Sequence, residues 1–248
     1  MIEVIDIQKS FGDNHVLKGI TAEFEPGVTN LIIGGSGSGK TTLLKCMVGL
    51  HQPNEGRVLY DDRNFTEMNM EERIPIRQEI GMLFQNSALF DSMTVEQNLM
   101  FPLDMFTNKK RGEKKDRASE VLERVDLAGK NKLYPSELSG GMKKRVGIAR
   151  AIVMNPKYLF CDEPNSGLDP RTSLLIDELI QEITEEYKIT TIIVTHDMNS
   201  VMGIGEKILF LHKGEKWWEG SNQEITKTDN QELNDFVFAS PLMEKLLR

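Results

Sequence analysis

Cysteine is scarce in this sequence, with only Cys46 and Cys161 among 248 residues. The two lie far apart, each within an apolar run, so a disulfide framework is a poor interpretation. Buried, reduced thiols are the better one, because a free cysteine packs as a small hydrophobic residue. The cysteine usage therefore favours a cytosolic chain over a secreted one.

Long apolar runs are also missing. The longest, such as residues 190–194 and 208–211, fall far short of the roughly 20 residues that a membrane-spanning helix needs. The first residues, MIEVIDIQKSFG, alternate apolar and charged side chains and contain no basic segment followed by an apolar one. We therefore expect no signal peptide, and the sequence predicts a soluble chain.

The sequence has no excess of positive charge. Its 30 lysines and arginines are outnumbered by 38 aspartates and glutamates, which leaves a formal net charge of −8. This is the wrong sign for a general nucleic-acid-binding protein, although a local basic patch would still be compatible with it. With 39% hydrophobic and 27% charged residues, the composition is that of an ordinary globular protein with one large domain or two small ones.

A glycine-rich segment stands between a strand-like run at residues 28–33 and a helix-like stretch that ends near Gly49. Its sequence, GGSGSGKT over residues 34–41, fits the phosphate-loop pattern G-x-x-x-x-G-K-[ST]. In such a loop successive N–H groups point at phosphate oxygens, Lys40 reaches the β- and γ-phosphates, and Thr41 ligates Mg²⁺. The alternative is a flexible glycine and serine turn, but chance gives this pattern only on the order of one time in a hundred.

Two further segments carry candidate chemistry. In KYLFCDEP an apolar run delivers Asp162 and Glu163 to a strand end, the edge at which open α/β sheets bind ligands. Asp162 suits Mg²⁺ coordination, and Glu163 suits a general base that orients the attacking water. In ELSGGMKKR, residues 137–145, a Ser-Gly-Gly turn precedes a helix and predicts a second anion site. An ordinary helix cap by Ser139 is the alternative there.

The remaining pattern indicates an α/β protein with a mostly parallel sheet. Strand-like runs at residues 158–161 and 190–194 flank an amphipathic stretch at 171–187, and a hairpin is expected from 208–211 and 216–219 around a turn at 213–214. Residues 86–155 look helical, with apolar residues three and four apart. The charged residues 109–115 are expected to form a solvated link within this lobe.

Taken in this order, the motifs closely resemble the ATP-binding cassette family, whose signature loop reads LSGGQ. The resemblance covers nearly the whole chain. It implies one nucleotide-binding domain of the P-loop NTPase fold, with a mostly parallel core sheet, an antiparallel β subdomain and an inserted helical subdomain. The implied parts are a core at about 1–85 and 156–228, a helical subdomain at about 86–155, and a C-terminal extension at about 229–248.

The resemblance also assigns roles to single residues. It implies catalytic roles for Glu163, His196, Gln85 and Lys40. It implies that Mg²⁺ is bound by Thr41, Gln85 and Asp162. The residues implied to hold ATP are Phe11, Gly34, Gly35, Ser36, Gly37, Ser38, Gly39, Lys40, Thr41, Thr42, Ser139, Gly140, Gly141 and Asp169.

Several of these roles have structural alternatives. Phe11 matches an aromatic residue that stacks on adenine, but it could be a core residue at a strand end. Gln85 could be a solvated side chain, and Asp169, which matches a loop crossing a dimer interface, could only cap the helix that starts at Pro170. His196 matches a histidine that contacts the γ-phosphate, whereas a lone histidine is more often structural.

The family pattern requires partners. Two cassettes pack head to tail, and each ATP lies between residues 34–41 of one chain and residues 139–141 of the other. Because this sequence has one of each loop, we expect a dimer of identical chains. The family further implies a transmembrane permease, which would place the chain at the cytoplasmic face of the inner membrane.

Departures from the general pattern narrow the subfamily. Met142 replaces the usual glutamine of the signature loop, and Gly35 replaces a common proline. Together with residues 81–103, Met142 looks like the Mla-type ATPases that drive phospholipid movement between bacterial membranes, which would add a lipid-binding partner protein. Leu89, Phe90 and Met93 would then face the permease, although core packing is an equal alternative.

Other functions remain as alternatives. An importer ATPase for amino acids or metals uses the same chemistry. A non-transport cassette protein and a degenerate cassette that only binds ATP are disfavoured, because the chain holds a single cassette and keeps Glu163 and His196. Apolar residues of the tail are expected to pack on the chain's own core rather than on a neighbouring cassette. They are Leu233, Phe236, Val237, Leu242, Met243, Leu246 and Leu247.

Overall fold

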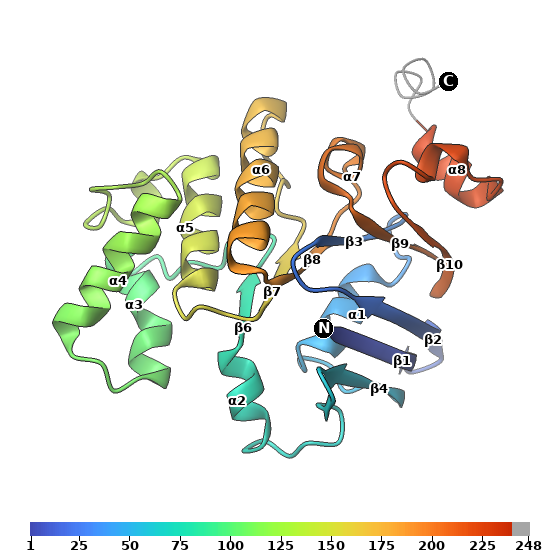
Figure 1. Ribbon diagram of the computed structural model, residues 1–248, viewed down its shortest axis with the longest axis horizontal. Helices are drawn as coiled ribbons and strands as arrows, with labels where there is room; N and C mark the ends of the chain where they lie inside the picture. The colour runs from blue at the N-terminus through green and yellow to red at the C-terminus, as the bar shows by residue number, and fades with distance from the viewer. Residues whose placement is uncertain (240–248) are drawn as a thin grey trace.

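The strands form two sheets in the computed structural model, which describes residues 1–239 (Figure 1). One sheet has the order β2-β1-β4-β5 and the other β10-β9-β3-β8-β7-β6. The strands are β1 (Ile2–Phe11), β2 (Asn14–Phe24), β3 (Thr29–Ile33), β4 (Glu55–Tyr60), β5 (Arg63–Asn64), β6 (Ile80–Leu83), β7 (Tyr158–Asp162), β8 (Thr190–Val194), β9 (Lys207–His212) and β10 (Glu215–Gly220). The helices are α1 (Lys40–Met47), α2 (Arg73–Gln78), α3 (Val95–Phe106), α4 (Arg111–Arg124), α5 (Gly140–Ile152), α6 (Pro170–Tyr187), α7 (Met198–Ile204) and α8 (Gln231–Val237).

The larger sheet is parallel from β9 through β3, β8 and β7 to β6. Strands β3, β7 and β8 are buried along their whole length, which explains the consecutive apolar residues at 31–33, 158–161 and 192–194. The expected hairpin is confirmed, because β10 pairs antiparallel with β9. Its two turn residues, Lys213 and Gly214, have φ values of 50° and 85°, as a tight hairpin turn requires.

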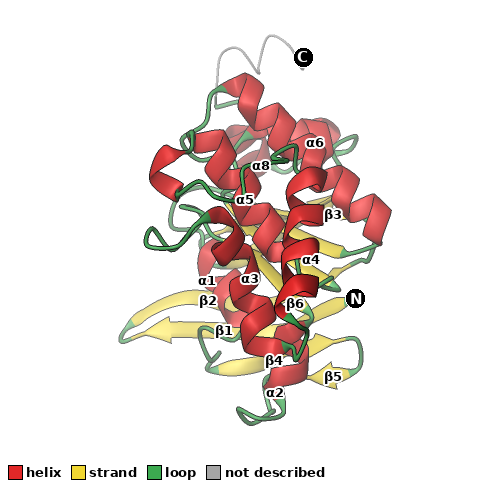
Figure 2. Ribbon diagram, turned by 90° about the vertical axis from the view of Figure 1, so that its left-hand side faces the viewer, coloured by secondary structure: helices red, strands yellow, loops and turns green. Residues whose placement is uncertain are grey.

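Helix α1 lies between the two sheets and joins them through one apolar core. Leu43, Leu44 and Met47 of α1 pack in the same cluster as residues of β1 and of the parallel sheet. A second core lies between the other face of the parallel sheet and α5, α6 and α7. Figure 2 shows most helices gathered above the small antiparallel sheet of β1, β2 and β4.

Both cysteines are free and buried, as the sequence predicts. Burial raises the pKa of Cys46 to about 11 and that of Cys161 to about 12. Neither thiol is therefore ionised at neutral pH.

The helical lobe differs from the sequence-based expectation at its basic segment. Helix α4 begins at Arg111, so most of residues 109–115 belong to a helix and are not a solvated link. The Glu113 carboxylate accepts a hydrogen bond from the Lys110 N–H at 2.8 Å and so closes the first turn. Lys114 is buried, with its ammonium group 2.8 Å from Asp104, because a long lysine stem covers apolar surface well.

The tail packs on its own chain as far as the structure describes it. Leu233 and Val237 of α8 are buried in the second core, and the ring of Phe236 lies 5.5 Å from that of Phe210. This confirms the expectation for those three residues. Leu242, Met243, Leu246 and Leu247 lie outside the described residues. Among residues 1–239, no helix is both long and apolar enough to cross a bilayer.

Candidate functional site

The loop at residues 34–39 joins β3 to α1, as its motif predicts. Gly34 has a φ of 146°, and a Cβ atom there would lie 2.2 Å from the main-chain oxygen of Leu211 in β9. Only glycine allows this approach, so the loop is folded tightly against the sheet edge. The N-terminus of α1 then points its free N–H groups and positive dipole end into the space above the loop.

The Lys40 side chain is buried rather than extended into solvent, with 8% of its surface exposed. Its ammonium group donates to the carbonyl oxygens of Gly34 at 2.8 Å and Gly35 at 3.0 Å. Burial lowers the pKa of Lys40, while Glu163 and Asp162 oppose that change. The carbonyl groups of the loop itself therefore bind the ammonium.

Two of the three residues expected to hold Mg²⁺, Thr41 and Asp162, meet near the carboxyl ends of β3 and β7. The Thr41 hydroxyl lies 3.4 Å from Oδ1 of Asp162, which is buried. Burial, followed by the neighbouring Glu163, raises the pKa of Asp162. A hydroxyl and a carboxylate fit Mg²⁺, a hard cation that takes oxygen ligands and shares its coordination sphere with phosphates and water. The Ser38 hydroxyl in the same loop is buried and has no hydrogen-bond partner among the described residues.

Glu163 and His196 form a pair next to this loop. Oε1 of Glu163 lies 2.8 Å from Nδ1 of His196, and an ionised carboxylate can only accept that hydrogen bond. Glu163 follows β7, and His196 follows β8, its parallel neighbour, so adjacent strand ends bring the two together. Gln85 follows β6 on the other side of β7, and its amide donates to Ser166 Oγ at 3.3 Å.

One cavity of about 610 Å³ brings together eight of the predicted site residues. Its predicted lining consists of Gly35, Ser36, Gly37, Lys40, Thr41, Gln85, Glu163 and His196. The sequence reasoning missed four further lining residues, Met198, Phe236, Val237 and Ala239. The apolar pattern of the tail predicts that Phe236 and Val237 are buried, but nothing in it indicates which surface they cover.

The signature segment and Asp169 are not part of this cavity lining. Ser139 and Gly140 are exposed at the start of α5, and Ser139 Oγ accepts a hydrogen bond from the Met142 N–H at 3.3 Å. Asp169 is also exposed and caps α6, because its Oδ1 accepts from the Thr172 N–H at 3.0 Å. A Cβ atom at Gly141 would lie 2.7 Å from Thr172, so these two helix starts form one surface. Ser139 and Asp169 therefore both cap helices, as their structural alternatives predict. These capping contacts are compatible with a further role toward a ligand or a partner chain.

Phe11 lies apart from the cavity lining but close to the phosphate loop. Its side chain is 46% exposed, which rules out a core role. The ring meets His51 edge-on at 5.3 Å and lies under the Lys9 ammonium at 5.1 Å. The β1–β2 hairpin that carries Phe11 touches the loop at Gly39, where a Cβ atom would lie 2.7 Å from Leu17. Phe11 is therefore an exposed aromatic ring on the hairpin that contacts the phosphate loop.

A buried polar network holds the segment between Glu163 and Asp169. The Asn165 amide donates to Asp177 Oδ1 at 2.8 Å and to Ser200 Oγ at 2.9 Å, which ties the segment to α6 and α7. Burial raises the pKa of Asp177 to about 6. The hydrogen bonds from Ser200 and Asn165 lower this pKa, whereas the neighbouring charges of Asp197 and Glu178 raise it further.

This network predicts a pH-dependent stability. The folded-state pKa of Asp177 is about 6 against an ordinary 3.8, so the folded chain holds the proton more tightly and the free energy of unfolding falls as pH rises through this window. The difference between these two pKa values corresponds to a change of roughly 3 kcal/mol in the free energy of unfolding. We expect Asp177→Asn to raise the melting temperature at pH 7.5 and to change it little at pH 4, measured by thermal unfolding across that range. The matched control, Asp116→Asn at an exposed position, should change neither; equal effects of Asp177→Asn at both pH values would contradict the prediction.

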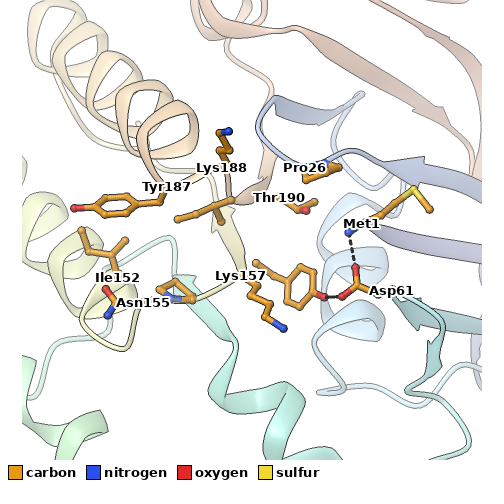
Figure 3. A pocket seen from close by; sticks show the side chains of 12 residues that line it. Met1, Pro26, Asp61, Ile152, Asn155, Lys157, Tyr187, Lys188 and Thr190 are labelled. Carbon is orange, nitrogen blue, oxygen red and sulfur yellow. Dashed lines mark hydrogen bonds and ion pairs between the residues drawn. The ribbon is translucent and has the colours of Figure 1, made fainter.

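A second cavity, of about 470 Å³, lies at the opposite edge of the sheet (Figure 3). It sits where β7 and β8 begin, between Tyr187 and Lys188 on one side and Met1 and Asp61 on the other. The Tyr158 hydroxyl donates to Asp61 at 2.7 Å, so this carboxylate is already engaged. Because ligands of open α/β sheets bind at the carboxyl ends of the strands, the cavity beside residues 34–41 is the better candidate.

Comparison with known proteins agrees with this arrangement. A family model described as "ABC transporter" matches residues 17–166. The chain is 36% identical over 236 residues to a "Probable ribonucleotide transport ATP-binding protein mkl" of Mycobacterium leprae, covering 95% of this chain and 68% of that protein. It is 38% identical over 237 residues to a "Methionine import ATP-binding protein MetN" of Clostridioides difficile, covering 96% and 74%.

Solved structures are similar over most of the chain. The dimeric post-hydrolysis state of the ATP-binding cassette MJ0796 bound to ADP and Pi matches with a TM-score of 0.82 and 32% identity, over 90% of this chain and 99% of that one. The cbiO1 protein of Clostridium perfringens, part of the cbiONQ ABC transporter complex, matches with a TM-score of 0.85 and 29% identity, over 99% and 98%. The predicted fold class is thereby confirmed, and the chain belongs to the ABC transporter family as an ATP-hydrolysing cassette, which binds ATP with Mg²⁺ as the family does.

Proposed function

We propose that this cassette is the ATP-hydrolysing subunit of a transporter that moves phospholipids between bacterial membranes. The observation that carries the choice of lipid is the sequence of residues 81–103 together with Met142 in the signature loop, which looks like the Mla-type ATPases. The chain would lie on the cytoplasmic face of the inner membrane, attached through a transmembrane permease, with a lipid-binding protein as a further partner.

The active site is proposed to be shared between two copies of the chain. Residues 34–41, with Gly39 and Thr42 at the start of α1, would hold the phosphates of ATP, and Phe11 would stack on the adenine. Ser139, Gly140, Gly141 and Asp169 would reach the same ATP from the partner copy. Their exposed position, outside the cavity that holds Lys40 and Glu163, supports this division. The core, helical and C-terminal parts are proposed at the boundaries given above.

Each polar group in the cavity has a proposed task. The Glu163 carboxylate would accept a proton from the attacking water, and His196 would hold that carboxylate in place and face the γ-phosphate. Lys40 would exchange its carbonyl partners for β- and γ-phosphate oxygens. Thr41, Asp162 and Gln85 would hold Mg²⁺, which neutralises charge on those oxygens when bound.

A groove between the helical lobe and the segment of α2 and β6 is the proposed permease contact. It has a volume of about 420 Å³, and its lining includes Phe84, Phe90, Phe101 and Phe106. Phe90 is 40% exposed and its ring lies 4.8 Å from that of Phe101. Leu89, which we expected beside it, is half-buried and packs against the core. The exposed aromatic rings of this groove suit an apolar segment of a membrane protein.

An importer is the second candidate function. The MetN relative from Clostridium tetani, a "Methionine import ATP-binding protein", is 41% identical over 211 residues. ATP hydrolysis would serve either transporter, and the two candidates differ in the transported substrate.

Co-purification tests the proposed function. Extraction of the chain in mild detergent should bring with it a multi-span permease and phospholipid, and hydrolysis by the reconstituted complex should rise with phospholipid and not with methionine. Phe90→Asp should release the permease while leaving ATP binding intact, because it places a charge in the groove. Met70→Asp, at an exposed apolar position elsewhere, is the control that should retain it. Stimulation by methionine would favour the importer, and a chain without any permease would refute transport.

A further inference from the structure

Lys144, in the second turn of α5, is buried with 4% of its surface exposed. Its ammonium group donates to the main-chain oxygen of Gln85 and, at 3.2 Å, to that of Glu163. Burial lowers the pKa of Lys144, and a buried ammonium is stable only where its donors find acceptors. Both acceptors are backbone atoms of proposed catalytic residues, on the two loops that follow β6 and β7.

The rest of the same helix face holds the loop after β6. Gly147, three residues on, lets α5 approach closely, because a Cβ atom there would lie 2.7 Å from Leu83. Arg150 then donates to the carbonyl oxygens of Ser87 and Ala88, each at 2.7 Å. Ser87 and Ala88 have φ values of 60° and 46°, a conformation that costs free energy unless neighbours impose it. The loop that carries Gln85 is therefore fixed to α5.

The Glu163 backbone is strained in the same way. Its φ is 49°, which is unfavourable for a residue with a side chain. Its N–H donates to the Val194 oxygen at 2.9 Å, and its carbonyl accepts from Lys144. The same carbonyl also accepts from the Ser166 N–H at 3.1 Å. Three hydrogen bonds thus hold this peptide segment, and the direction of the Glu163 side chain depends on them.

We propose that Lys144 is a positioning residue for ATP hydrolysis, which fixes the Gln85 and Glu163 loops relative to each other and to α5 through their main-chain oxygens. The inference rests on the catalytic roles proposed for Gln85 and Glu163. Lys144 itself touches neither ATP nor water in this account. Ser139 caps the N-terminus of the same helix, so the Lys144 side chain ties the signature loop to the chain's own catalytic loops.

Loss of the ammonium group should affect the chemical step and not ATP binding. In Lys144→Met the apolar stem remains, but the hydrogen bonds to the Gln85 and Glu163 carbonyl oxygens are lost. A resulting displacement of the catalytic carboxylate by about 1 Å would lower the rate about a hundredfold. We expect kcat for ATP to fall by that factor with an unchanged KM, because the groups at residues 34–41 that bind ATP are not touched. Lys144→Arg should restore most of the activity, since a guanidinium can also donate to two carbonyl oxygens.

The control is Lys114→Met, which removes the ammonium of another buried lysine whose partner is Asp104 in the helical lobe. It should keep the wild-type kcat, and so separates a general cost of losing a buried charge from a loss of positioning. Steady-state phosphate release by the full chain gives kcat and KM, and thermal unfolding reports folding. If Lys144→Met does not fold, Lys144→Leu provides the same comparison. If neither variant folds while Lys144→Arg is stable, the role of Lys144 is structural and the proposal is overturned.

Glu163→Gln in the same assay separates this inference from the roles on which it rests. An active Glu163→Gln chain would refute the catalytic role of Glu163. An inactive Glu163→Gln chain beside a fully active Lys144→Met chain would overturn the positioning role alone. A Lys144→Met chain whose KM rises while its kcat is unchanged would overturn it as well. Because the assay contains no lipid or methionine, its result does not depend on the transported substrate.

Discussion

Replacing Glu163 with glutamine is expected to stop ATP hydrolysis while ATP binding persists. The carboxylate lies in the cavity with Lys40 and Thr41 and is aligned by His196 at 2.8 Å. A positioned general base contributes about 10² to 10⁴ in rate, and an amide cannot accept the proton. In the proposed shared site, ATP affinity depends instead on the loop at residues 34–41 and on the opposing signature loop, and this change leaves both intact.

The same substitution should accumulate a closed dimer. Removing one negative charge beside the γ-phosphate lowers the repulsion in the ATP-bound state, and ATP that is bound but not hydrolysed keeps the two copies together by mass action. Light scattering with ATP and Mg²⁺ should report the dimer, alongside phosphate release. Glu178→Gln, at an exposed position of α6, should hydrolyse ATP normally and serves as the control. Wild-type hydrolysis by Glu163→Gln would mean that another group is the catalytic base.

Sequence patterns predict this fold best where the pattern lies within a single helix, strand or turn. The apolar runs within β3, β7 and β8 are buried throughout, and the Lys213-Gly214 turn closes the β9–β10 hairpin. The phosphate-loop motif fixes its own context, because the strand, the glycines and the helix are contiguous. Adjacent parallel strands then carry Gln85, Glu163 and His196 to one edge without further information.

Contacts between distant segments could not be predicted in this way. Lys144 is 59 residues from Gln85 and 19 from Glu163 along the chain, and a lysine in a basic stretch normally faces solvent. The placement of α8 beside the cavity depends on the packing of Phe236 on Phe210, which no local pattern specifies. Lys114 was misjudged for a related reason, since its burial depends on Asp104 in the preceding helix.

Lys40→Ala is expected to abolish productive use of ATP. It removes the ammonium that neutralises the β- and γ-phosphates, and this electrostatic stabilisation is central to phosphoryl transfer. The loop should remain folded, because the freed carbonyl oxygens of Gly34 and Gly35 lie beside the cavity where water can replace the ammonium. Ser139→Arg should be equally inactive, since it places a bulky cation where the partner's phosphate would lie, at a helix-capping cost of about 1 kcal/mol.

Mixing the two inactive chains then tests whether the site is shared. In a mixed dimer, one site combines the intact Lys40 of the Ser139→Arg chain with the intact Ser139 of the Lys40→Ala chain, while the other site carries both defects. Random exchange makes about half of the dimers mixed, each with one working site of two, so about a quarter of wild-type turnover is expected if the sites act independently.

The control mixture contains Lys40→Ala with the double variant Lys40→Ala/Ser139→Arg. No dimer in it has an intact site, so it should stay inactive. A site built within one chain would need Lys40 and Ser139 from the same molecule, and no mixture could then recover activity. Absence of turnover in mixed dimers verified by mass spectrometry would therefore contradict the shared site, whereas partial recovery cannot arise from either chain alone.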